Sequence, residues 1–134
     1  MQITQATDYA LRALSYLGQQ APEEGRVSAK EIAEEQKIPI RFLLKIMRQL
    51  MYEGIVKSYR GNSGGYALAK PPQDITLLDV VEALEGKIIL NRCLEDPDLC
   101  NRNAAEYCKI HAALQEIQDE VVVQMQQYTL ADFI

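Results

Sequence analysis

The sequence lacks the features of a membrane or secreted protein. No apolar run approaches the roughly 18 residues that a membrane-spanning helix needs. The first residues, Met-Gln-Ile-Thr, lack the basic start and the apolar stretch of a secretory signal. We therefore expect a soluble cytoplasmic protein with no membrane partner. A chain of 134 residues is expected to form one domain, to which a dimerisation element can be appended.

The sequence also lacks the residue patterns of an enzyme. It contains one histidine, no Ser/His/Asp set and no paired-carboxylate site. The glycine-rich run at residues 61–65 lacks the Gly-Lys-Ser/Thr ending of a nucleotide-binding P-loop. These absences favour a binding protein with no catalytic residues and no small-molecule substrate.

Basic residues are outnumbered by acidic ones, 14 to 19, and the net charge of −5 argues superficially against a nucleic-acid partner. Their distribution matters more than their sum. Residues 37–70 contain seven basic residues and one acidic residue, a net charge of +6, whereas the remainder of the chain carries −11. A basic patch on an acidic body is typical of local contact with duplex DNA.

The basic segment contains the second of two predicted helices that are separated by a tight turn. Ser28 and Glu31 form a capping-box signature, which opens a first helix that extends to about residue 36. After a turn at residues 37–38, the second helix is expected from Pro39 to Gly54. The helical period separates its apolar side chains from its cations, which are respectively Leu43, Ile46, Met47 and Leu50, and Arg41, Lys45 and Arg48. This pattern predicts a helix-turn-helix that presents cations to double-stranded DNA.

A predicted β-hairpin follows the helix pair. Residues 55–60 and 66–69 are rich in strand formers, and residues 61–65 predict the turn between them. A hairpin in this place is a wing, which favours DNA binding over an ordinary surface helix with a solvated basic face. Further helices are expected at residues 4–20 and 77–84, and a loop at 21–27. The predicted fold is mainly α with a small β-hairpin wing, and residues 1–86 form a winged helix-turn-helix DNA-binding domain.

The last predicted helix runs from about residue 104 to residue 128, within a carboxy-terminal segment at 104–134. Its apolar residues follow the alternation of a coiled-coil seam that is broken by Gln124: Ile110, Leu114, Ile117, Val121 and Tyr128. We predict that this long helix is the interface of a homodimer, and the alternative is that it packs on the chain's own core. The tail after residue 128 carries apolar side chains that can dock on the protein.

Residues 87–108 form a predicted polar loop that contains all three cysteines, Cys93, Cys100 and Cys108. His111 follows three residues after the last of them. An odd number of cysteines excludes a closed disulfide framework. Four soft or borderline ligands suit a tetrahedral metal ion or an iron–sulfur cluster, although their spacing matches neither paired zinc ligands nor ferredoxin motifs. Redox-active thiols and incidental thiols are the alternatives.

Four stretches together resemble the Rrf2 family of bacterial winged-helix regulators. They are Asp-Tyr-Ala-Leu-Arg-Ala-Leu at 8–14, Tyr-Arg-Gly-Asn-Ser-Gly-Gly-Tyr at 59–66, Ile-Thr-Leu at 75–77, and the three-cysteine loop with its Cys-x-x-His ending. The resemblance covers essentially the whole chain, and the Cys-x-x-His ending is most like the IscR type. It implies a homodimeric transcription regulator whose operator binding is controlled by an iron–sulfur cluster, with IscR-like control of cluster assembly genes.

The resemblance also implies which residues hold the cluster. Cys93, Cys100, Cys108 and His111 would bind a [2Fe–2S] cluster, although the gaps between the cysteines are longer than in the IscR type. Asp8 stands where nitric-oxide-sensing NsrR regulators carry a carboxylate ligand from the partner subunit, so a [4Fe–4S] cluster that includes Asp8 is the alternative. A cluster-free regulator of thiol metabolism, of the CymR type, is a further alternative. The DNA-binding set predicted from the helix pair and the wing is Ser28, Arg41, Lys45, Arg48, Arg60, Gly61 and Tyr66. The resemblance implies that Arg60 enters the flanking minor groove.

Overall fold

The computed structural model describes residues 2–20 and 25–134, so residues 21–24 of the predicted loop lie outside the described residues. Within the described ranges the chain forms six α-helices, one two-stranded hairpin and three short 3₁₀ turns. In order they are α1 (Gln5–Gln20), α2 (Ala29–Gln36), α3 (Ile40–Tyr52), β1 (Val56–Tyr59), β2 (Gly65–Leu68), η1 (Pro72–Asp74), α4 (Leu77–Glu85), α5 (Arg92–Glu95), η2 (Pro97–Leu99), α6 (Lys109–Gln127) and η3 (Leu130–Phe133). The predicted fold class, mainly α with a β-hairpin wing, is confirmed.

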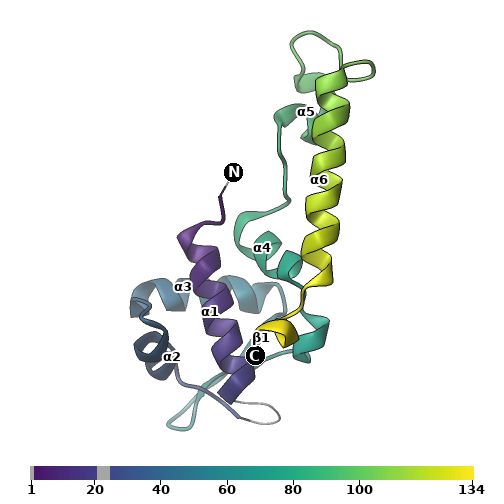
Figure 1. Cartoon of the computed structure of the whole chain (residues 1–134). Coiled ribbons are helices and arrows are strands. Elements are labelled where there is room, and N and C mark those ends of the chain that lie inside the picture. The colour runs from purple at the N-terminus through teal and green to yellow at the C-terminus, as the bar shows by residue number, and fades with distance from the viewer. Residues whose placement is uncertain (1, 21–24) are drawn as a thin grey trace.

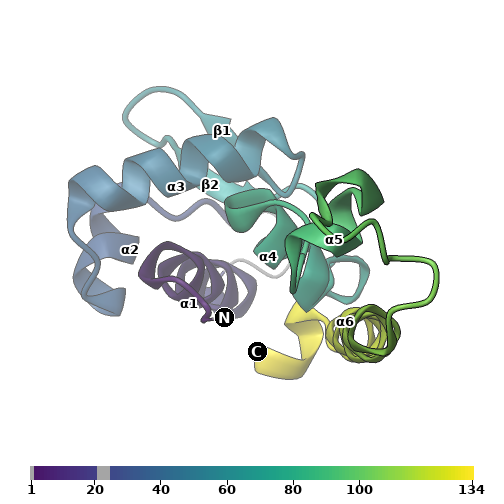
Figure 2. The same cartoon turned by 90° about the horizontal axis from the view of Figure 1, so that it is seen from above.

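The molecule consists of a helical body and a long helix that extends beyond it (Figures 1 and 2). Helices α1 to α4 and the hairpin contact one another in the body, and α6 packs on it through α4. The short helix α5 lies beside the first turns of α6, at the end away from the body (Figure 1). No helix in the described part of the chain is both long and apolar enough to cross a membrane.

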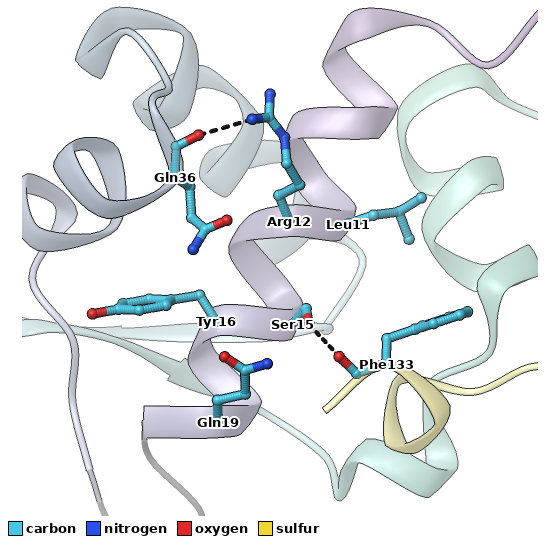
Figure 3. A pocket seen from close by; sticks show the side chains of 7 residues that line it. All are labelled: Leu11, Arg12, Ser15, Tyr16, Gln19, Gln36 and Phe133. Carbon is cyan, nitrogen blue, oxygen red and sulfur yellow. Dashed lines mark hydrogen bonds between the residues drawn. The ribbon is translucent and has the colours of Figure 1, made fainter.

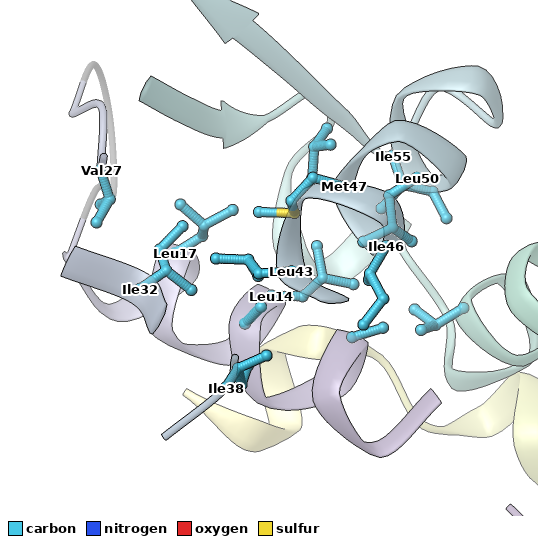
Figure 4. Close-up of a cluster of buried hydrophobic side chains, with 14 of the residues drawn as sticks. Leu14, Leu17, Val27, Ile32, Ile38, Leu43, Ile46, Met47, Leu50 and Ile55 are labelled. Atoms are coloured by element: carbon cyan, nitrogen blue, oxygen red, sulfur yellow. The ribbon is translucent and has the colours of Figure 1, made fainter. Parts of the chain in front are cut away.

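The core of the body is built on the apolar face of α3. Leu43, Ile46, Met47 and Leu50 of this helix are all buried, as the helical period predicts. They contact buried side chains from α1, α2 and the segment before β1, including Leu14, Ile32 and Ile55 (Figure 4). Burial of one face fixes the rotation of α3, so its cationic face is held towards solvent.

The helix ends follow local capping chemistry. The Ser28 hydroxyl accepts a hydrogen bond from the Glu31 amide at 3.1 Å, which makes Ser28 the N-cap of α2. The Glu31 carboxylate does not complete the predicted box. It accepts a hydrogen bond from the Tyr16 hydroxyl at 2.8 Å, which raises the pKa of Tyr16 to about 12. Lys37 ends α2 in the left-handed conformation, with φ of 56°, and so forms the tight turn into α3.

The hairpin closes where the glycine run predicts. Strands β1 and β2 are antiparallel, with Val56 opposite Leu68 and Tyr59 opposite Gly65. A Cβ atom on Gly64 would clash with the carbonyl oxygen of Tyr59, so this position requires glycine. The hairpin is tied back to the body because the amide of Tyr66 donates to the carbonyl of Val27 at 2.8 Å.

The structure corrects two boundaries in the carboxy-terminal half. The predicted loop at residues 87–108 contains α5, which Asn91 caps by accepting the Arg92 amide, and the 3₁₀ turn η2. The last helix begins at Lys109 rather than near residue 104, because Asn103 takes a left-handed conformation and Ala104 buries its methyl group in a separate turn. Cys108 is therefore the extended N-cap residue of α6 and lies just outside the helix.

The tail docks on the body, as its apolar side chains predict. Leu130 is fully buried, and its amide donates to the carbonyl of Ile75 at 2.9 Å. The Ser15 hydroxyl of α1 donates to the carbonyl of Phe133 at 2.6 Å. The end of α6 is thereby fastened to α1.

We expect Leu130→Ala to lower the free energy of unfolding by about 2–5 kcal/mol, because the substitution leaves a cavity in the core. Leu99→Ala is the matched control, since Leu99 is 45% exposed and its truncation should cost about 0.5 kcal/mol or less. Urea denaturation of both variants measures the difference. Equal losses would contradict the docking of the tail.

Candidate functional site

The exposed face of α3 carries the predicted row of cations. Arg41, Lys45 and Arg48 are exposed and lie opposite the buried side chains of the same helix. None of the three forms a salt bridge with any residue that the structure describes. Their charges are therefore available to an anionic partner, which is the arrangement expected of a DNA recognition helix.

Exposed apolar side chains flank these cations, and the sequence reasoning did not single them out. Ile40, Phe42 and Leu44 are 43%, 59% and 42% exposed, respectively. By the helical period Phe42 and Leu44 fall off the buried stripe, which is the signal that could have identified them, whereas Ile40 lies at the edge of the stripe, roughly 20° from Met47. The first half of α3 thus presents both cations and apolar groups to solvent.

The wing adds a second basic surface beside α3. Arg60 and Gly61 are exposed at the turn between the strands, where Gly61 has φ of 95°. The Arg26 guanidinium lies 3.8 Å from the centre of the Tyr59 ring, and the Lys57 ammonium lies 5.8 Å from it. Arg26 was missed by the sequence reasoning because it precedes the basic segment and reaches the wing only through the tertiary fold.

Two residues of the predicted DNA-binding set have structural roles. Ser28 caps α2 with its hydroxyl, as described above. The backbone of Tyr66 pairs with Val27, and its half-buried ring packs against the core. Any contact of either residue with DNA stays a prediction.

The predicted cluster ligands lie on or beside α5, η2 and the first turn of α6, at the end of α6 away from the body. Cys93 lies on α5, Cys100 follows η2, Cys108 precedes α6 and His111 lies in the first turn of α6. The imidazole Nδ1 of His111 lies 3.3 Å from the Cys93 Sγ. This is a hydrogen-bond distance, and it places two of the four predicted ligands side by side.

The other two cysteines stand apart from that pair. All three thiols are free and half-buried. In residues 2–20 and 25–134, no group of three or more His, Cys, Asp and Glu side chains is arranged to hold a metal ion. The structure therefore brings together Cys93 and His111, but it does not bring Cys100 and Cys108 to them.

The surroundings of Cys100 favour the thiolate form of its side chain. The backbone amides of Ala104 and Arg102 donate to its sulfur, and with the Arg102 charge they lower the pKa of the Cys100 thiol. A thiolate is the form of cysteine that binds metals. Three free thiols and one imidazole at one end of the molecule fit an iron–sulfur cluster in donor chemistry.

Asp8, the alternative fourth ligand, lies on α1 in the body rather than near the cysteines of its own chain (Figure 1). Its carboxylate is 3.2 Å from Arg12 Nε. The Arg12 guanidinium also donates to the carbonyl of Gln36 at 2.9 Å and so joins α1 to the end of α2. A role for Asp8 at a cluster therefore requires a second subunit.

A cavity of about 290 Å³ lies between α1, the end of α2 and the docked tail (Figure 3). Arg12 and Ser15 point towards its two sides, where each donates the hydrogen bond described above. Leu11 and Phe133 line the apolar part. No cysteine, no carboxylate and none of the predicted site residues lines this cavity.

The predicted seam of α6 is largely uncovered in the single chain. Ile110 and Ile117 are 65% and 50% exposed, and Gln118 is the only residue of α6 that is buried. The Gln118 side chain accepts a hydrogen bond from the Leu90 amide at 2.8 Å, which holds the segment before α5 against the helix. Packing on the chain's own core therefore accounts for little of the apolar surface of α6.

Comparison with known proteins agrees with the predicted resemblance. Residues 3–134 match the family model described as Rrf2, iron-dependent transcriptional regulator. The HTH-type transcriptional regulator NsrR of Shouchella clausii (strain KSM-K16) is 33% identical over 135 residues, which cover 100% of this chain and 89% of that protein.

Two solved structures share the architecture. T. potens IscR has a TM-score of 0.76 and 28% identity, over 98% of this chain and 85% of that one. CymR (YrzC), the global cysteine regulator of B. subtilis, also has a TM-score of 0.76 and 28% identity, over 98% and 95% of the two chains. The chain belongs to the Rrf2 family of transcriptional regulators.

Proposed function

We propose that the protein is a homodimeric DNA-binding regulator whose affinity for its operator is controlled by an iron–sulfur cluster. The observation that carries the DNA-binding part is the exposed cationic face of α3, which forms no salt bridge within the described residues. In a dimer, two such helices enter successive major grooves about 34–36 Å apart on a pseudo-palindromic site. Arg60 in the wing contacts the flanking minor groove.

The dimer forms along α6. The apolar side chains of its exposed seam, such as Ile110 and Ile117, need a partner, and a second copy of the same helix supplies a matching face. An apolar groove that Leu77 of α4 and Met125 help to line includes Ile117, Val121 and Tyr128 of this seam. The interface is therefore formed by α6 and the adjoining edge of α4.

Cys93, Cys100, Cys108 and His111 hold the cluster in the IscR-like form that we propose, with a [2Fe–2S] centre. The contact between Cys93 and His111 supports His111, rather than Asp8 of the partner subunit, as the fourth ligand. Bound there, the cluster would supply iron–ligand bonds that join α5, the turn after η2 and the start of α6. The protein's own contacts then link α6 to α4 and α4 to α3.

This chain of contacts explains how the cysteine end can affect DNA binding. A change in the position of α6 shifts α4 and alters the separation of the two recognition helices, which is a coupling between two binding sites. Gln118 belongs to this path because it fastens the segment before α5 to α6.

A cluster-free regulator of the CymR type is the second candidate. The separation of Cys100 and Cys108 from the Cys93–His111 pair favours it. An anaerobic preparation that is colourless and free of iron and sulfide would support this candidate.

In the NsrR-like alternative, with a [4Fe–4S] cluster and Asp8, nitric oxide would bleach the cluster and change DNA affinity together.

The direct test of DNA binding is the selection of an operator from a random duplex pool, followed by titration of the selected duplex. Lys45→Ala should weaken binding to all sequences and reduce the slope of log K against log [salt] by about one for each copy that touches a phosphate. Lys87→Ala removes the same charge from an exposed position after α4 and should leave the slope unchanged. An unchanged slope for Lys45→Ala would exclude this phosphate contact.

A further inference from the structure

The amino-terminal half of α3 combines charges and apolar groups on its solvent side. Helical geometry places Phe42 roughly 100° from Arg41 on one side and Leu44 about 60° from Arg41 on the other. Phe42 is 59% exposed and Leu44 is 42% exposed, while Leu43 between them is fully buried. The cations are therefore flanked on both sides by large apolar side chains.

The partner that fits this surface must be anionic and must also offer apolar groups. In the major groove of duplex DNA, the thymine C5-methyl is the apolar group among the base edges. Residues at the start of a recognition helix contact base edges, and Phe42 and Leu44 are the third and fifth residues of α3. Neither side chain can donate or accept a hydrogen bond, so neither can read a polar base edge.

We propose that Phe42 and Leu44 determine operator specificity by contacting thymine C5-methyl groups. Arg41, Lys45 and Arg48 supply phosphate contacts and position the helix, whereas the two apolar residues require A·T base pairs at the positions that face the first half of α3. This inference rests on the proposed DNA binding and adds to it the class of base that is read.

The test uses the operator selected by the protein itself, in which thymine is replaced by uracil one base pair at a time. This replacement removes only the methyl group. At the contacted positions we expect affinity to fall about fourfold for each methyl, and about fifteenfold when both half-sites are changed. Phe42→Ala or Leu44→Ala should bind the thymine and uracil duplexes equally at the position that the lost side chain contacts.

Tyr52→Ala is the matched control, because Tyr52 is 89% exposed at the other end of α3 and its loss should leave the thymine preference intact. Equal affinity for thymine and uracil at every position would overturn the inference while leaving DNA binding in place. Loss of affinity for all sequences together with a weaker dimer in Phe42→Ala would also overturn it, since Phe42 would then contact a second copy. Failure to retain any duplex at low salt would instead refute the proposed function on which the inference rests.

Discussion

Replacing Arg41, Lys45 and Arg48 together by alanine is expected to lower the affinity for duplex DNA by at least ~10³-fold at about 0.1 M salt. All three side chains are exposed on one face of α3, and a dimer presents this face twice. Six cations would then be lost, and each one that touches a phosphate contributes through the release of a counterion. Fluorescence anisotropy with the selected operator measures the loss.

The same triple variant should keep its fold, because none of the replaced side chains belongs to the core. Its thermal unfolding midpoint, its dimer mass and its iron content after anaerobic reconstitution are the controls. Undiminished DNA affinity in a folded, dimeric variant would show that α3 is not the recognition helix.

Replacing any one of Cys93, Cys100 and Cys108 by serine is expected to remove nearly all bound iron and sulfide after reconstitution. A cluster of this kind needs thiolate ligands, and a serine hydroxyl ionises far less readily than the Cys100 thiol, whose pKa is lowered by backbone amides. Iron and acid-labile sulfide assays, together with the visible absorbance of the cluster, measure the loss.

Two further substitutions distinguish His111 from Asp8 as the fourth ligand of the cluster. His111→Ala should reduce iron content or shift the visible spectrum, whereas Asp8→Asn should leave both unchanged and disturb only the contact with Arg12. The opposite pattern would assign the site to the NsrR-like alternative. Full iron loading in all three cysteine variants would exclude the cluster from these residues.

The helix-turn-helix could be predicted from the sequence because its signals are local. The helical period of α3 identified Leu43, Ile46, Met47 and Leu50 as buried, and the hydroxyl of Ser28 identified the start of α2. The wing could also be predicted from the sequence, because its turn depends on glycines such as Gly64, where a side chain would clash with the neighbouring strand.

The cysteine region was harder to predict because its geometry depends on distant contacts. Helix α5 has only four residues, too few to show a period, and its place is fixed by contacts with α6. Cys93 and His111 are 18 positions apart, and nothing in their spacing indicates that their side chains lie 3.3 Å apart. Helix α6 begins at Lys109 rather than at the predicted residue 104, because burial of Ala104 and the left-handed turn at Asn103 override local helix propensity.

The most direct test of the account compares the operator affinity of one anaerobic protein preparation before and after its cluster is removed. If occupancy of the cysteine end controls the recognition helices, the two forms should differ by about 5–150-fold on at least one selected operator, which is the range of coupling between two sites. Equal affinities of the iron-loaded and iron-free forms, on every operator tried, would contradict the account.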